Sequence, residues 1–118
     1  MKPATGRQYE RRLKEYLTRF GFFVMRAGGS GARSREYTPD LVAIRRDKIL
    51  IIEVKDYSTP RIYLDERQVL GLKEIEEKTG GVALVCNRRK CVTLDSLERV
   101  GKTYLFDVER GKEIQVFF

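Results

Sequence analysis

The sequence contains no histidine, the residue that most often transfers protons in enzymes. Its absence excludes Ser-His-Asp and Cys-His catalysis, zinc hydrolysis with histidine ligands, and nuclease chemistry that needs a histidine base. Any hydrolytic chemistry would therefore use carboxylates, lysines and a hard metal ion.

Long apolar runs are also missing, because no stretch approaches the roughly 20 residues that cross a bilayer. The first seven residues, Met-Lys-Pro-Ala-Thr-Gly-Arg, lack the apolar core of a signal peptide. We therefore expect a cytoplasmic protein with no membrane partner. The length of 118 residues predicts a single domain over 1–118.

Cysteine is scarce, and Cys86 and Cys91 lack the paired spacing of a zinc site. We interpret them as ordinary small strand residues. A disulfide across a hairpin is the alternative, and it is expected in a cytosolic chain only if the source is a hyperthermophile.

Basic residues outnumber acidic ones by 24 to 17, which gives a net charge of +7 and a pI near 9.6. Nucleic acid is the favoured partner for such a chain. An anionic membrane surface is the alternative, but no Lys/Arg-rich helix with a broad apolar face supports it.

Two apolar runs of strand length, 39–44 and 49–55, are joined by the polar segment 45–48 and predict a β-hairpin. Because side chains alternate along a strand, Glu53 and Lys55 share one face while Leu50 and Ile52 share the other. In the register that the short turn suggests, Asp40 comes alongside Glu53. Two acids and a lysine would then converge.

This combination of residues suits phosphodiester hydrolysis with Mg²⁺, which one or two carboxylates and a phosphate oxygen can hold. Asp40 and Glu53 are the proposed ligands. Lys55 would orient or deprotonate the attacking water, or stabilise the developing negative charge. The alternative is a modest surface ion pair between Glu53 and Lys55.

Two amphipathic helices are predicted, over 6–20 and from 65 to the glycines at 80–81. Glu10 lies at the edge of the first apolar stripe, and the basic residues Arg7, Arg11 and Lys14 occupy the next sector. On the helix alone, an ion pair between Glu10 and Lys14 is the favoured interpretation. Asp65 and Gln68 have the form of a capping box, which accounts for Gln68 by itself.

The remaining apolar segments predict strands. Residues 22–27 indicate a buried strand, and 82–86 indicate a central strand covered on both faces. Segments 91–94, 104–106 and 114–118 are candidate short strands of unknown order. The last would be an exposed apolar edge in a monomer, which indicates either an interface or packing that the sequence does not reveal.

Residues 28–35 form a Gly-, Ser- and Arg-rich loop that is not a P-loop. One interpretation is a flexible connection. The other is a DNA-facing loop in which the backbone amides and the arginines Arg33 and Arg35 meet phosphates.

Taken together, these residues resemble the archaeal Holliday junction resolvases, a branch of the restriction-endonuclease-like PD-(D/E)xK nucleases. The resemblance spans about Gly6 to Lys90. It is carried by Gly6, Glu10-Arg11, Gly21-Phe22, Arg26, Gly29-Ser30-Gly31, Pro39-Asp40-Leu41-Val42-Ala43, Ile52-Glu53-Val54-Lys55, Tyr63, Gln68 and Gly80-Gly81.

The resemblance implies an α/β (α+β) fold, with a restriction-endonuclease-like core of order α-β-β-β-α-β in which helices flank a central mixed sheet. It also implies a homodimer and a metal site of Glu10, Asp40 and Glu53 beside Lys55. Mg²⁺ is the expected cofactor, with Mn²⁺ as a substitute. Ser30 is implied as a further catalytic residue. The expected DNA-binding set is Arg7, Arg11, Lys14, Arg26, Gly29, Ser30, Gly31, Arg33, Arg35 and Gln68.

The function so implied is a structure-selective endonuclease of recombination and repair. It would resolve four-way junctions by paired nicks in opposing strands, with no small-molecule substrate. We predict that the loop at 28–35 passes into the junction, so that its deletion spares folding and abolishes selective cleavage. Two alternatives stay open: a related nuclease acting on duplex or flapped DNA, and a non-catalytic DNA-binding module.

Overall fold

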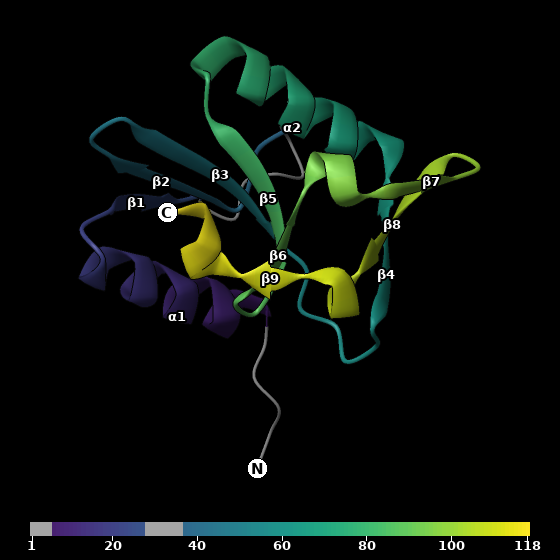
Figure 1. The fold of residues 1–118 in the computed structure, drawn as a ribbon, viewed down its shortest axis with the longest axis horizontal. Coiled ribbons are helices and arrows are strands. Elements are labelled where there is room, and N and C mark those ends of the chain that lie inside the picture. Colours follow the sequence, from purple (N-terminus) through teal and green to yellow (C-terminus); the bar gives the residue numbers. More distant parts are fainter. Residues whose placement is uncertain (1–5, 28–36) are drawn as a thin grey trace.

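The structure is a computed structural model that describes residues 6–27 and 37–118 (Figure 1). Its two α-helices are α1 (Gly6–Arg19) and α2 (Glu66–Thr79). The strands are β1 (Phe23–Arg26), β2 (Leu41–Arg45), β3 (Lys48–Val54), β4 (Arg61–Asp65), β5 (Val82–Asn87), β6 (Lys90–Thr93), β7 (Glu98–Val100), β8 (Thr103–Asp107) and β9 (Lys112–Glu113). Short 3-10 helices span Leu94–Ser96, Val108–Arg110 and Ile114–Phe117.

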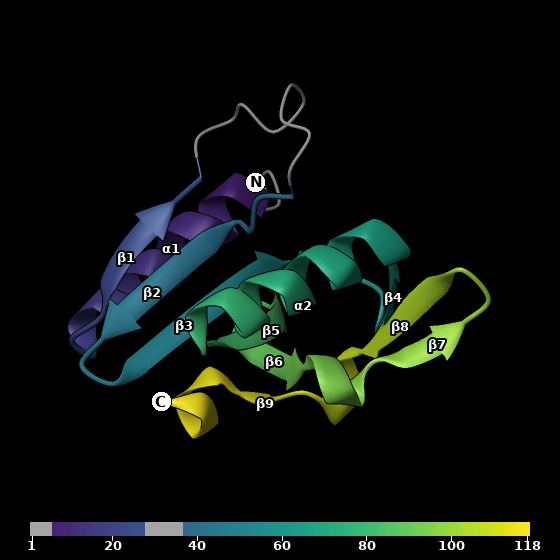
Figure 2. The same cartoon turned by 90° about the horizontal axis from the view of Figure 1, so that it is seen from above.

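The main sheet is mixed and has the strand order β1-β2-β3-β5-β6-β9. Strands β3 and β5 run parallel through the α2 crossover, and the other neighbours are antiparallel. Helices α1 and α2 lie on opposite faces of this sheet, as Figures 1 and 2 show. The predicted core order and mixed sheet are therefore confirmed.

Alternation along β3 divides the core into two layers. Leu50 and Ile52 are fully buried with Leu13 and Leu17 of α1. Ile51 is buried on the other face, against Val69 and Leu72 of α2. The second layer also takes in Ile62, Leu64 and Phe106 of the smaller sheet. Because β3 is apolar on both faces, it is held firmly at the centre of the fold.

The predicted ends of both helices are confirmed. Gly21 follows α1 with a φ of +87°, and Gly80 follows α2 with a φ of +73°, both in the left-handed region that favours glycine. The capping box of α2 is also present, and in it the backbone N–H of Gln68 donates to Asp65 Oδ1 at 2.9 Å.

The strand predicted at 22–27 is confirmed as β1, but the prediction that it is buried was wrong. Strand β1 lies at the edge of the sheet, where Val24 is buried against α1 and Phe23 and Met25 are exposed on the other face. Because α1 covers only one face of β1, an apolar run along this strand does not mean that both faces are buried.

Near the C-terminus, the strands predicted at 91–94 and 104–106 are confirmed as β6 and β8. The strand predicted at 114–118 is not found, and of the two alternatives for this apolar segment the structure shows packing within the chain. Ile114–Phe117 form a 3-10 helix, Ile114 is fully buried, and Phe117 and Phe118 pack on the α1 layer. Strand β4 was not predicted; it pairs with β8, which in turn pairs with β7, in a separate sheet.

The interpretation of the cysteines as unpaired residues was wrong as well. Cys86 and Cys91 lie opposite each other on β5 and β6, and they form a disulfide. Both are fully buried in the α1 layer. The bond therefore cross-links the hairpin that closes this side of the sheet.

Neither helix in the described ranges has the length and apolarity needed to span a membrane. The predicted DNA-facing loop at 28–35 lies outside the described residues.

Candidate active site

Asp40 and Glu53 lie side by side at one end of the β2–β3 pair. The register pairs Leu41 with Ile52, so Asp40, which precedes β2, falls next to Glu53. The backbone N–H of Val54 donates to Asp40 Oδ2 at 2.7 Å, which fixes the position of this carboxylate against β3. The predicted convergence of these two acids is confirmed.

Glu53 is the buried acid of the pair, and only 6% of it is exposed. Its Oε1 accepts a hydrogen bond from the Tyr37 hydroxyl, and its Oε2 lies 3.5 Å from Lys55 Nζ. Burial raises the pKa of Glu53 to about 7, and the neighbouring Asp40 adds to this, while Tyr37 and Lys55 oppose it. The carboxyl group is thus poised to exchange its proton for a cation near neutral pH.

Lys55 shares a face with Glu53, as predicted, and it is not the exposed partner of a surface ion pair. The side chains of Lys55 and Glu53 are 14% and 7% exposed. An ammonium group held this close to the Glu53 carboxylate would meet a substrate bound at that carboxylate.

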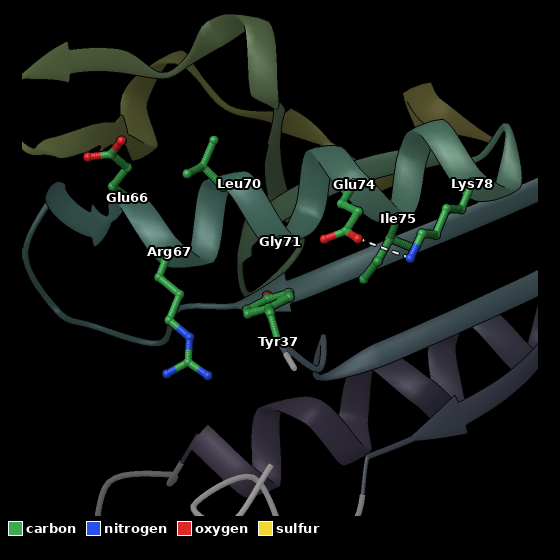
Figure 3. Close-up of a pocket in the computed structure, with 8 residues that line it drawn as sticks. All are labelled: Tyr37, Glu66, Arg67, Leu70, Gly71, Glu74, Ile75 and Lys78. Carbon is green, nitrogen blue, oxygen red and sulfur yellow. Dashed lines mark ion pairs between the residues drawn. The ribbon is translucent and has the colours of Figure 1, made fainter. Parts of the chain in front are cut away.

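Tyr37 is the residue of this site that the sequence analysis missed. Its ring packs against α2 at Gly71, where an added Cβ would lie 2.4 Å from Tyr37 Cγ (Figure 3). Burial raises the pKa of Tyr37, and Glu53 raises it further, so the hydroxyl remains a hydrogen-bond donor. The one signal in the sequence was a tyrosine just before the Thr-Pro-Asp segment.

Glu10 faces the strands and does not pair with Lys14, so the interpretation favoured from the helix alone was wrong. Its Oε1 lies 3.7 Å from Arg26 Nε on β1. Burial raises the pKa of Glu10, and Asp40 adds to this, whereas Arg26 and Arg7 lower it. Glu10 and Asp40 therefore lie close enough to interact through their charges.

The Nε of Arg26 is buried and has no hydrogen-bond partner among the described residues. A buried donor without an acceptor is costly, and a phosphate oxygen would satisfy it. Through its ion pair with Glu10, Arg26 of the edge strand β1 therefore lies beside the acids of the site.

The other predicted residues are more dispersed. Arg7, Arg11 and Lys14 are exposed along α1. Gln68 is engaged in the capping box, in which it accepts from the Asp65 amide at 3.4 Å. The predicted residues that lie outside the described ranges are Gly29, Ser30, Gly31, Arg33 and Arg35.

The donor set suits a hard divalent cation. Two carboxylates lie side by side, and the pKa of Glu53 is raised first by burial and second by Asp40, so a cation would relieve both. No group of three or more His, Cys, Asp or Glu side chains in the described parts of the chain is close enough to hold a metal together. The Asp40–Glu53 pair is therefore the better supported ligand set, and Glu10 lies farther out.

A mixed sheet flanked by two helices, with an acid-x-Lys strand beside a second acid, defines the restriction-endonuclease-like nucleases. Archaeoglobus fulgidus Hjc, described as a Holliday junction resolvase from an archaeal hyperthermophile, has this fold. It matches the present structure with a TM-score of 0.84 and 29% identity, over 95% of this chain and 99% of that one.

The chain belongs to the archaeal Holliday junction resolvase (Hjc) family, whose family model matches residues 1–117. Relatives named crossover junction endodeoxyribonuclease Hjc include the Sulfolobus acidocaldarius protein, 33% identical over 91% of this chain and 79% of the relative. The Methanocaldococcus jannaschii protein is 32% identical over 96% and 83%. The Sulfurisphaera tokodaii protein is 29% identical over 93% and 83%.

Proposed function

We propose that this chain is a metal-dependent endonuclease that resolves four-way DNA junctions by paired, symmetric nicks in opposing strands. The observation that carries the proposal is the convergence of Asp40, Glu53 and Lys55 at the end of β3, in a chain that belongs to the Hjc family. Residues 1–118 would act as one nuclease domain, because the two sheets share one apolar layer.

Asp40 and Glu53 would hold a Mg²⁺ ion, and Mn²⁺ has the same preference for oxygen ligands. The ion would supply a bound water of lowered pKa and a positive charge at the scissile phosphate. Tyr37 donates to Glu53 Oε1 and the Val54 amide donates to Asp40 Oδ2, so each carboxylate is oriented before any ligand arrives.

Lys55 would act on the reacting atoms directly. Its ammonium can orient the attacking water or stabilise the negative charge that develops on the phosphate oxygens. Arg26 would contact a phosphate through its guanidinium group, whose buried Nε has no hydrogen-bond partner among the described residues. The ion pair with Glu10 would hold Arg26 in place. Ser30 is proposed as an auxiliary on the basis of family membership.

DNA contacts are proposed along the N-terminal part of α1, through Arg7, Arg11 and Lys14, and in the segment 28–35. These contacts are mostly to phosphates, so they would recognise the shape of a branch more than its sequence.

We also propose a homodimer, since two equal nicks across a two-fold junction need two sites related by a two-fold axis. The apolar face of β1 and β2 supports it. Phe23, Met25 and Ile44 are 67%, 47% and 37% exposed on the face opposite α1. An apolar face of this kind suits a second copy of the chain.

The proposal is tested by incubating the purified chain with a labelled synthetic four-way junction, in Mg²⁺ or in EDTA, beside Asp40→Asn and a linear duplex of matched sequence. We expect paired symmetric nicks in the junction only, dependent on Mg²⁺. Asp40→Asn should lower the cleavage rate by at least about 100-fold, since it removes a carboxylate ligand, and it should leave junction binding intact.

Equal cleavage of the linear duplex would indicate a related nuclease without junction selectivity. Junction binding with no cleavage in any divalent metal would indicate a DNA-binding module, and the catalytic roles proposed here would then be wrong.

A further inference from the structure

A second basic site lies on the other flank of α1 from Glu10. It is a groove of about 330 Å³ between α1 and the β5–β6 turn. Arg12 and Arg19 reach it from α1, and Arg88 and Arg89 reach it from the turn. Leu13 and Tyr16 line it, with Tyr9 at the position nearest the start of the helix.

Three of the four arginines of this groove lie over aromatic rings. Arg12 Cζ and Arg88 Cζ lie 5.4 Å and 5.0 Å from the centre of the Tyr9 ring. Arg89 Cζ lies 4.8 Å from the centre of the Tyr16 ring, and the Tyr16 hydroxyl accepts a hydrogen bond from Gln115. A guanidinium on a ring face keeps its N–H edges available for an anion.

The charges in the groove are poorly compensated. Across the described ranges, no carboxylate forms an ion pair with any of the four arginines. Glu15 is the single acid that lines the groove, and Asp56 lies near enough to Arg88 and Arg12 to interact with them through charge. A net positive groove with oriented guanidinium groups is suited to bind phosphates.

The groove is connected to the active site through Asn87. This buried side chain donates from Nδ2 to the carbonyl oxygens of Lys55 and Tyr57, at 2.9 Å and 2.8 Å. Asn87 therefore fixes the turn that carries Arg88 against the segment that follows β3. A DNA strand that leaves the active site on this side of α1 would enter the groove.

We propose that this groove binds the phosphate backbone of the same DNA, beyond the bond that is cut. The inference rests on the proposed function and adds Arg12, Arg19, Arg88 and Arg89 to the DNA-binding surface. Arg12 and Arg19 are separated by about 10 Å along α1, which is roughly three base steps along one strand. The contacts would be independent of sequence, because phosphates and guanidinium groups carry them.

The test measures the Kd for a four-way junction in EDTA over a series of salt concentrations, for the unaltered chain and for Arg88→Asn/Arg89→Ala. Asn is chosen because Arg88 has a φ of +57°, which Asn tolerates. Loss of two phosphate contacts should weaken binding and lower the slope of log Kd against log salt by about two. Arg12→Ala, on the other wall, should lower it by about one.

The matched control is Arg46→Ala/Lys102→Ala, which removes two exposed charges at the β2–β3 and β7–β8 turns. This variant should keep the original slope. If the unaltered chain cuts junctions, two results would overturn the inference: an unchanged slope in Arg88→Asn/Arg89→Ala, or an equal fall of the slope in the control. Failure of the proposed function would be distinguishable, since the unaltered chain itself would then show no metal-dependent cleavage.

Discussion

At the scale of single residues, Glu53 is a buried acid whose charged form is destabilised by its surroundings. It is an acid with 6% exposure beside Asp40, and its ionisation is opposed by burial first and by Asp40 second. The charged form of Glu53 therefore lowers the stability of the metal-free fold at the position where we propose that a cation binds.

This conflict predicts how stability depends on pH without metal. Below pH 4.5 Glu53 is protonated in the folded and unfolded states, so it contributes no penalty. As the pH rises towards 7, the unfolded chain releases this proton and the folded chain retains it, so the free energy of unfolding falls. Above about pH 7 the loss is complete and amounts to about 3 kcal/mol.

Glu53→Gln should therefore flatten this dependence and unfold later than the unaltered chain at pH 8 in EDTA. Urea denaturation at pH 4.5 and pH 8 measures the difference. Glu77→Gln, which changes an exposed acid on α2 instead, serves as the control for the loss of one negative charge. A steep pH dependence that persists in Glu53→Gln would show that another group is responsible.

The same residues show how far sequence can predict a site. Alternation and a short turn were enough to place Asp40, Glu53 and Lys55 together, because strand geometry fixes which side chains share a face. The partner of Glu10 could not be found in this way. Arg26 meets Glu10 only once α1 has packed on β1, and Tyr37 reaches Glu53 only through its contact with α2.

At the scale of elements, α2 supports the active site through one close contact. Gly71 lies on the flank of α2 that lines a groove of about 570 Å³, and the ring of Tyr37 occupies the space a side chain at Gly71 would need (Figure 3). The helix thereby holds the tyrosine whose hydroxyl orients Glu53.

We expect the sign of Gly71→Ala to depend on Tyr37. With Tyr37 present, the added methyl group should destabilise the fold by about 1–3 kcal/mol, and it should slow cleavage by displacing Tyr37. In a Tyr37→Ala background the clash is gone, and alanine should then stabilise the helix by up to about 1 kcal/mol relative to glycine. Thermal unfolding of the four chains in this cycle measures the coupling. Equal effects of Gly71→Ala in both backgrounds would contradict the contact.

Elements also differ in how well the sequence predicted them. Helices α1 and α2 and the β2–β3 hairpin carry strong local signals, and their positions were predicted closely. Strand β4 has five residues between a loop and a capping box, and its pairing with β8 joins segments about 40 residues apart. The apolar run at 114–118 suggested a strand, yet burial of Ile114 and packing of Phe118 on Phe22 favour a 3-10 turn instead.

At the scale of the whole molecule, one chain leaves an apolar surface on the main sheet uncovered. Strands β1 and β2 pack against α1 through Val24 and Ala43, whereas Phe23 and Ile44, paired directly across the ladder, are exposed on the opposite face. Helix α2 covers that same face over β3 and β5. This strip, exposed among the described residues, is where we propose that a second copy of the chain binds.

The homodimer is tested by Phe23→Ser/Met25→Ser in sedimentation experiments. Because both side chains are exposed in the single chain, the variant should fold normally and should sediment as a monomer where the unaltered chain is a dimer. Its junction cleavage should change from paired nicks to single, uncoupled nicks, since one active site then acts alone. Val100→Ser/Val116→Ser removes two exposed apolar side chains elsewhere and should leave the dimer intact. A variant that still dimerises would place the interface on another face, and a monomeric unaltered chain that makes paired nicks would contradict the two-fold arrangement itself.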